Sequence, residues 1–414
     1  MKEKIINIII SIVAGFIFME LITVGWYFFN DSKLFYTNTK IYQLIEEAES
    51  NKLTGERIHP YFGFSNPVAE DSVNNHGFVS PYNYPFIRNN ENQYIIGIFG
   101  GSVAKGFALE GKKQLIEALK KHTFFEDKEI ILLNFCAGGY KQPQQLLILN
   151  YYLTVGQELD MVINVDGFNE LALSNRNNEQ AIDISMPSVD HIGPLTNLID
   201  QTTLTREKLE SLASINQHKI RLNRVVEMMN NTHFASAYFM LEQFYKILYS
   251  RYTTELVTFQ QLESNSLDDS IVHIYLADKQ SSLILFDHIV LHWTNASIMM
   301  NETLKSKHIL YFHFLQPNQY YSNKVFSDEE RKIAFVEDHP YRAPIEKGYP
   351  ILMDQAGFLK QNGVNFYSAV NIFDDEVNII YKDSCCHYNQ LGNDVLANFI
   401  SDSILDMNYF HASN

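Results

Sequence analysis

The sequence predicts an α/β protein in which a central parallel sheet of about five strands lies between two layers of helices, a three-layer α/β/α sandwich. Short apolar runs rich in β-branched and aromatic residues recur along the chain. The first three of these runs end in turns that contain glycine. Runs of this length and composition are typical of buried strands, and strands that alternate with helices form parallel sheets.

The first three predicted strands place polar turn residues at one edge of this sheet. The strands are 94–99, 129–135 and 161–166, and the turn after the first is Gly100-Gly101-Ser102. Ligands bind at the carboxyl edge of open α/β sheets, and glycines allow the sharp turn that exposes a serine hydroxyl. Ser102 is therefore a candidate nucleophile, although a serine in such a turn can also simply cap the next helix.

The remaining strands are expected at 309–315 and 364–369. A long insertion, residues 172–307, separates the third strand from the fourth. Apolar residues recur in it at helical spacing over 205–230 and 235–263, so we expect a helical lid or cap.

Two further turn residues can assist a serine nucleophile. Gly139 follows the second strand and can offer its backbone N–H, while Asn169 follows the third strand and carries a side-chain amide. Together with the N–H of Ser102 they predict an oxyanion hole.

These blocks resemble the SGNH (GDSL-like) hydrolase superfamily, in its membrane-anchored bacterial form, over residues 90–175 and 305–405. Ser102, Gly139 and Asn169 match its nucleophile, glycine and asparagine, and His387 matches its catalytic histidine. The resemblance implies an SGNH, flavodoxin-like sheet and ester hydrolysis by a serine mechanism that uses no metal and no cofactor.

The chain departs from the family pattern in two places. The usual Gly-Asp-Ser is Gly100-Gly101-Ser102 here, and the position three residues before the histidine, usually aspartate, is Ser384. Asp383 lies four residues before His387, so it can orient the imidazole only if the loop bulges by one residue. We name Asp383 as the third catalytic residue because a carboxylate stabilises the imidazolium that forms when histidine accepts the serine proton.

The three cysteines do not form a disulfide framework. Cys385 and Cys386 adjoin the predicted base, as a vicinal disulfide or as two inert thiols, and a thiol nucleophile is the less favoured interpretation.

The N-terminus is predicted to be an uncleaved signal anchor. Residues 5–29 are almost entirely apolar and long enough to span a bilayer, with Glu20 as an ionisable residue inside the run. Lys2 and Lys4 precede it, so the positive-inside tendency leaves the N-terminus cytoplasmic and the catalytic domain periplasmic or extracellular. The predicted organisation is an anchor (1–30), a segment that packs on the domain (31–90) and an SGNH-like domain (91–414).

The net charge of −16 and the absence of a basic stripe exclude nucleic acid as a partner. We expect a membrane-anchored serine esterase of the cell envelope that acts on O-acyl esters, such as O-acetyl esters, of a glycan or lipid. Two alternatives stay open: an O-acyltransferase to a polysaccharide, and a catalytically inactive relative that binds a glycan or a partner protein. A carboxylate within about 3.2 Å of one His387 ring nitrogen, with the other nitrogen facing Ser102, favours an enzyme.

Overall fold

A computed structural model gives the arrangement of the chain in two compact units, which we describe separately. One unit comprises residues 1–55 and 200–269, and the other comprises residues 56–199 and 270–414. The residues that the structure describes are 2–31, 34–37, 56–68, 72–196, 206–261, 274–336, 338–407 and 410. Parts of the predicted 31–90 segment and of the insertion therefore lie outside the described residues.

The larger unit is built on a parallel sheet, and the predicted fold class is confirmed. Among the described residues the sheet has five strands in the order β4-β3-β5-β6-β7. All four neighbouring pairs are parallel, and Gly100 of β3 pairs with Val165 of β5. The strands are β3 (Gln93–Gly100), β4 (Glu129–Asn134), β5 (Met161–Asp166), β6 (Leu310–Leu315) and β7 (Asn365–Ser368).

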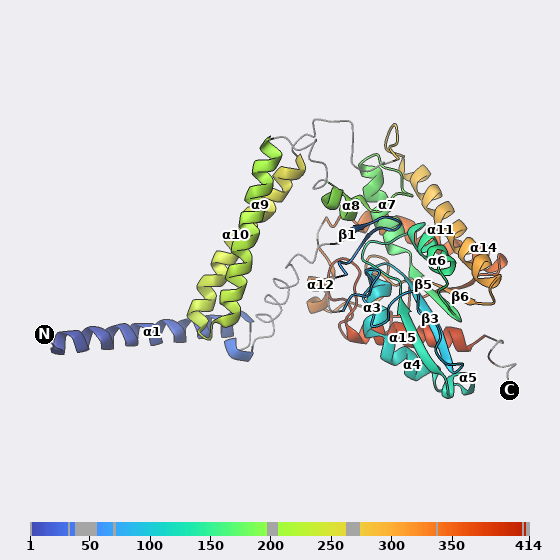
Figure 1. The fold of residues 1–414 in the computed structure, drawn as a ribbon. Coiled ribbons are helices and arrows are strands. Elements are labelled where there is room, and N and C mark those ends of the chain that lie inside the picture. Colours follow the sequence, from blue (N-terminus) through green and yellow to red (C-terminus); the bar gives the residue numbers. More distant parts are fainter. Residues whose placement is uncertain are drawn as a thin grey trace. The chain divides into compact units, whose positions relative to one another are not determined.

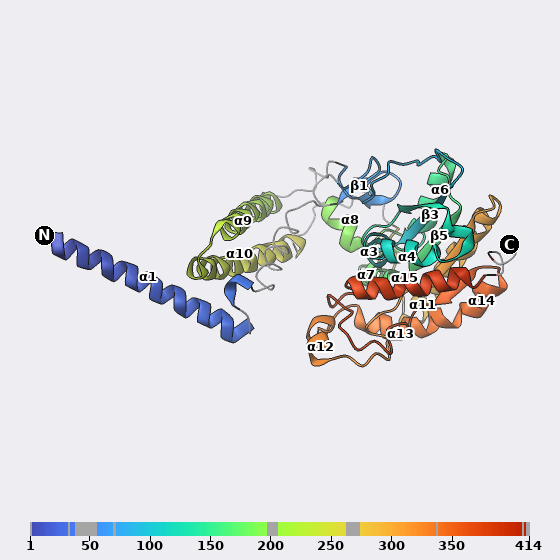
Figure 2. The same cartoon turned by 90° about the horizontal axis from the view of Figure 1, so that it is seen from below.

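Helices cover both faces of this sheet (Figures 1 and 2). One group packs together on one face, namely α3 (Ser102–Glu110), α4 (Lys112–Leu119) and α15 (Gln390–Leu405). A second group covers the other face, namely α6 (Gln144–Thr154), α7 (Phe168–Glu179), α11 (Ser282–Lys305) and α13 (Arg342–Asp354). Shorter helices complete the unit, namely α5 (Thr123–Glu126), α8 (Val189–Thr196), α12 (Asp328–Ala334) and α14 (Ala356–Gln361). The predicted helical insertion between the third and fourth strands of the sheet is present, since α7 to α11 lie between β5 and β6.

Residues 56–68 and 72–92 pack against this unit. The strands β1 (Arg57–His59) and β2 (Gly63–Ser65) form a small antiparallel pair. Phe62, Phe78 and Tyr84 are buried in the same hydrophobic core as the sheet. This burial attaches the segment to the sheet at several points along its length.

A buried polar cluster lies beneath the carboxyl ends of β5 and β6. The Asp166 carboxylate accepts hydrogen bonds from Trp293 Nε1 (2.7 Å) and His313 Nε2 (2.8 Å). His313 Nδ1 lies 2.8 Å from Ser297 Oγ, and the His313 side chain is fully buried. His313 is thus a hydrogen-bonded core residue, and its two ring nitrogens have partners within the core.

The smaller unit consists of the N-terminal helix and a helical hairpin. It contains α1 (Lys2–Asp31), the 3₁₀ helix η1 (Phe35–Thr37), α9 (Arg206–Asn231) and α10 (Ala235–Gln261), and α9 packs along α10 (Figure 1). Tyr27, Phe35, Met229 and Tyr238 belong to a hydrophobic cluster separate from the sheet core. Part of the apolar surface of α9 and α10 is therefore buried together with residues of the N-terminal segment.

Two helices among the described residues are long and apolar enough to cross a membrane, Ile6–Asn30 of α1 and α11. Nearly half of the apolar window in α11 is buried, and it places Leu285, Trp293 and Met300 in the core. By contrast, α1 exposes apolar side chains over much of its surface, including four consecutive residues from Phe16 to Met19. An apolar helix with no polar face is typical of a membrane span.

Candidate active site

Ser102 lies where β3 passes into α3, at the carboxyl edge of the sheet. Gly100 has φ +142°, and a Cβ at this position would overlap the backbone oxygen of Val165 in β5. Only glycine accommodates both the dihedral and this approach. The sheet order reverses between β3 and β5, and ligands bind at such switch points in open α/β sheets.

The structure brings Ser102, His387 and Asp383 together in one hydrogen-bonded chain. His387 Nε2 lies 2.7 Å from Ser102 Oγ, and His387 Nδ1 lies 2.5 Å from Asp383 Oδ2. The second oxygen of Asp383 accepts the backbone N–H groups of Cys385 (2.9 Å), Cys386 (3.1 Å) and His387 (3.3 Å). The carboxylate is held from its own loop and therefore faces the imidazole in a defined direction.

The loop from Lys382 to His387 accommodates the one-residue offset of the aspartate. A bridge between Tyr381 and Tyr388 closes its base, and the Lys382 N–H donates to the His387 carbonyl at 3.0 Å. The side chain of Gln319, which follows β6, donates to the Cys385 carbonyl at 3.1 Å. These bonds hold the bend so that the residue four positions before His387 reaches its ring.

The electrostatics of the pair suit a base and its supporting carboxylate. Burial lowers the pKa of the His387 imidazolium, but the hydrogen bond and charge of Asp383 outweigh it, so the net shift of this pKa is upward. Burial raises the pKa of Asp383, but its hydrogen bonds to His387 and to the backbone of the loop have a larger, opposite effect. The net shift of this pKa is downward. Asp383 is thus ionised across the range in which His387 titrates.

Asn169, the second residue of α7, lies beside the serine turn. A Cβ on Gly101 would overlap the Asn169 amide nitrogen, so glycine at this position leaves room for this amide. Asn169 Nδ2 donates to the Tyr140 carbonyl at 2.8 Å. An amide nitrogen carries two hydrogens, and this bond uses one of them.

Gly139 has φ +75°, and its Cα lies against the ring of His191, which any side chain at this position would overlap. His191, from α8, stacks on Phe64 with ring centroids 5.1 Å apart. Among the described residues no acceptor is bound to the Gly139 N–H. Gly139 directly precedes Tyr140, whose carbonyl accepts the hydrogen bond from Asn169. The same loop therefore positions both Gly139 and Asn169, two of the predicted oxyanion donors.

We expect Asn169→Ala to lower kcat for an ester substrate by roughly 10²- to 10³-fold while leaving measurable activity, because one oxyanion donor is worth about 2.7 to 4 kcal/mol. Initial rates of the purified chain measure this loss. Asn175→Ala, on the same helix α7, is the matched control and should retain the wild-type rate. A kcat unchanged by Asn169→Ala would remove Asn169 from the oxyanion hole.

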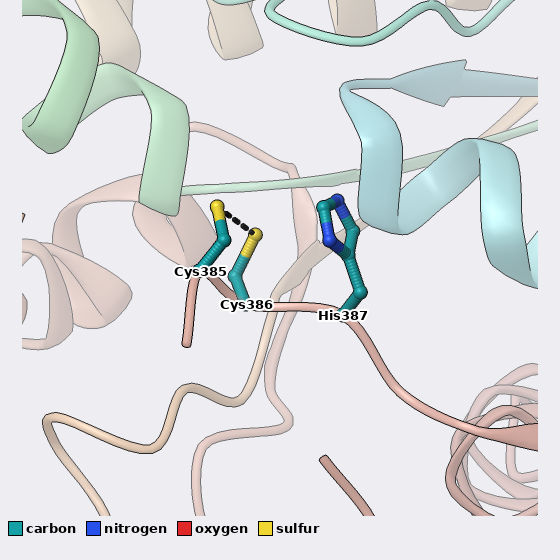
Figure 3. A group of neighbouring side chains, drawn as sticks. All are labelled: Cys385, Cys386 and His387. Atoms are coloured by element: carbon teal, nitrogen blue, oxygen red, sulfur yellow. Dashed lines mark hydrogen bonds between the residues drawn. The ribbon is translucent and has the colours of Figure 1, made fainter. Parts of the chain in front are cut away.

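The three cysteines are thiols. Cys385 and Cys386 point to the same side of the loop as the His387 ring, and their sulfurs are 3.4 Å apart (Figure 3). Burial raises the pKa of the Cys386 thiol well above its ordinary value, which keeps it protonated and a poor nucleophile.

Both thiols and the imidazole have ligand atoms within 4.8 Å of one another. A thiophilic metal ion bound there would have to take a His387 nitrogen from Ser102 or from Asp383.

The double variant Cys385→Ser/Cys386→Ser should keep fluorophosphonate labelling and ester hydrolysis within about threefold of wild type, because serine is close to cysteine in size and the group that contacts His387 Nε2 is the Ser102 hydroxyl. Labelling gels and initial rates provide the measurement. Loss of labelling in this variant, with an unchanged melting temperature, would assign the nucleophile to a thiol.

Three supporting residues were not expected from the sequence. Glu170 ties two loops of the site together, because its carboxylate accepts the N–H of Gly167 (2.8 Å) and the N–H of Gln142 (3.0 Å). Its position three residues after Gly167 is the spacing of a helix capping box, a signal that was present in the sequence. Gln319 and His191 act across long sequence separations, which no local pattern reveals.

Fold and site together define an α/β protein with a Ser-His-Asp arrangement at the carboxyl edge of a parallel sheet. No protein-family model matches the chain, and no curated protein sequence matches it. Among solved structures it is similar to an acetyl xylan esterase, AlAXEase, with TM-score 0.35 and 11% identity, over 75% of this chain and 98% of that one. It is also similar to a candidate acylhydrolase from Bacteroides fragilis, with TM-score 0.32 and 11% identity, over 77% of this chain and 88% of that one.

Proposed function

We propose that this protein is a membrane-anchored serine ester hydrolase of the SGNH type, which acts on O-acyl esters of an envelope glycan or lipid. The observation that carries the proposal is the chain of hydrogen bonds from Ser102 through His387 to Asp383. Its distances satisfy the criterion that favours an enzyme over an inactive binding protein. The exposed apolar surface of α1 supports the membrane anchor.

In the proposed mechanism Ser102 Oγ attacks the carbonyl carbon of the ester as His387 Nε2 accepts the hydroxyl proton. Asp383 stabilises the imidazolium, and the N–H groups of Ser102 and Gly139 with the Asn169 amide receive the oxyanion. His387 then returns the proton to the leaving alkoxide, which departs as an alcohol. An acyl group remains on Ser102, and an acceptor activated by His387 removes it.

The molecule that accepts the acyl group from Ser102 decides whether the reaction is hydrolysis or acyl transfer. Water yields the free acid, whereas a sugar hydroxyl yields a new ester, and both reactions use the same side chains. The proposal places the catalytic unit on the periplasmic or extracellular side, because Lys2 and Lys4 precede the anchor.

The test uses the full chain in detergent with aryl acetate and aryl octanoate esters, each with and without a soluble O-acetylated polysaccharide or a sugar acceptor. Release of free acid that depends on Ser102 supports the hydrolase. An ester newly formed on the sugar supports the transferase. If the wild-type chain neither reacts with a fluorophosphonate nor hydrolyses these esters, while a control esterase does both, the glycan- or partner-binding alternative is favoured.

A further inference from the structure

One face of the anchor helix α1 contacts the tip of the α9–α10 hairpin, residues 228–244. The Phe16 and Phe234 rings lie 5.2 Å apart, and those of Trp26 and Phe239 lie 5.0 Å apart. Tyr27 OH donates to the Glu242 carboxylate at 2.7 Å. Phe16 and Tyr27 are eleven residues apart, about three helical turns, so the contact extends over about 16 Å of α1.

Glu20, inside the apolar run, has its hydrogen-bond partners at the N-terminus of α10. Its carboxylate accepts the N–H of Ala235 (2.5 Å), the N–H of Ser236 (3.0 Å) and the Ser236 hydroxyl (2.6 Å). Tyr36 OH donates to it at 3.2 Å. A carboxylate at a helix N-terminus is stabilised by the free N–H groups and the helix dipole, which offsets part of the cost of placing an acid within the span.

The contacts with α1 set the depth of the hairpin tip. A bilayer core of about 30 Å takes about 20 helical residues, so a span that begins directly after Lys4 ends near Val24. Along the helix axis, Glu20 is then about 6 Å and Phe16 about 12 Å inside the hydrocarbon boundary. The tip residues that contact them lie at the same depth.

The surface of the tip fits this depth. Met228, Phe234, Met240 and Phe244 each expose half or more of their surface. Met228, Met240 and Phe244 border a shallow groove that also includes Asn231, whose amide donates to the Glu227 carbonyl at 2.8 Å. A surface of large apolar side chains mixed with satisfied polar groups is typical of elements that lie at the boundary between headgroups and acyl chains.

We propose that the hairpin tip, residues 228–244, inserts into one leaflet beside α1 and forms a second, monotopic contact with the lipid. The inference rests on the membrane anchor of the proposed function, and it does not depend on the catalytic activity. It assigns the end of the hairpin where α9 meets α10 to the membrane, and it commits to lipid as the occupant of the exposed apolar face.

The test reconstitutes the full chain in phosphatidylethanolamine–phosphatidylglycerol vesicles that carry a phosphatidylcholine with a diazirine in its acyl chain. After irradiation, mass spectrometry locates lipid adducts. We expect adducts on residues 5–29 and on residues 228–244, with none on the first half of α9, where Leu209 is equally apolar and exposed. Met240→Asp/Phe244→Asp should lose the adducts on 228–244, whereas Leu209→Asp should keep them.

Each other outcome overturns the inference in a recognisable way. Adducts on α1 alone would keep the anchor and refute insertion of the tip. A tip without adducts that instead cross-links to a second copy of the chain would make this face a protein interface. Absence of adducts from both segments would refute the anchor and the inference together, while the esterase assays would still decide the activity.

Discussion

Ser102→Ala is expected to abolish covalent labelling of the full chain by a fluorophosphonate and to lower kcat for an activated ester on the order of 10⁶-fold. Ser102 Oγ is the hydroxyl that His387 Nε2 contacts, at 2.7 Å, and alanine leaves no atom to form the acyl-enzyme. Labelling gels and initial rates with an aryl acetate measure the two effects.

Ser384→Ala is the matched control for this variant. Ser384 lies in the loop that carries His387, and its backbone carbonyl accepts a hydrogen bond from the Tyr320 hydroxyl. Alanine at this position keeps that carbonyl. Labelling and activity should therefore stay close to wild type. A Ser102→Ala protein that still reacts with the probe would place the reactive nucleophile at another residue and refute the site.

Asp383→Asn should lower kcat on the order of 10⁴-fold and move the acid limb of the pH–rate profile to lower pH. His387 must be neutral to accept the serine proton, so activity falls as the pH drops through its pKa. Asp383 raises that pKa above the ordinary value of 6.5, and the acid limb of the wild type should lie above this value. Loss of the carboxylate charge lowers the pKa, and the limb follows it.

The measurement is the pH dependence of kcat/KM for both proteins. Asp394→Asn, which removes one carboxylate from the helix after His387, is the control and should leave the profile in place. An acid limb that does not move in Asp383→Asn would show that Asp383 does not support the base, even if the rate falls.

The strands of the sheet could be predicted because their signal is local. Runs such as 94–99 and 161–166 are buried on both faces, so most of their residues are apolar, and the strands observed match them within one or two residues. The turn residues that follow are glycines for a backbone reason, as the φ of Gly100 shows. Parallel connection then brings the ends of these strands to one edge without further information.

The arrangement around the base was predictable only in part. Ser102, Asn169 and His387 could be picked out because their sequence blocks occur in the order that resembles the SGNH pattern. The structure brings Ser102 and His387 together. The offset of Asp383 could not be resolved from spacing, because a loop of six residues has many conformations. Its bend depends on Gln319, more than sixty positions away in the chain.

The sequence by itself determined the fold class, the residues at the strand ends and the apolar N-terminal helix, because each depends on neighbours within a few positions. Only the tertiary structure decided the partners of Glu20, the ring of His191 over Gly139 and the two loops held by Glu170. Glu20 and Ser236 are more than two hundred residues apart. Such pairs form because a polar group removed from water must find a partner, and the folded chain decides which one lies within reach.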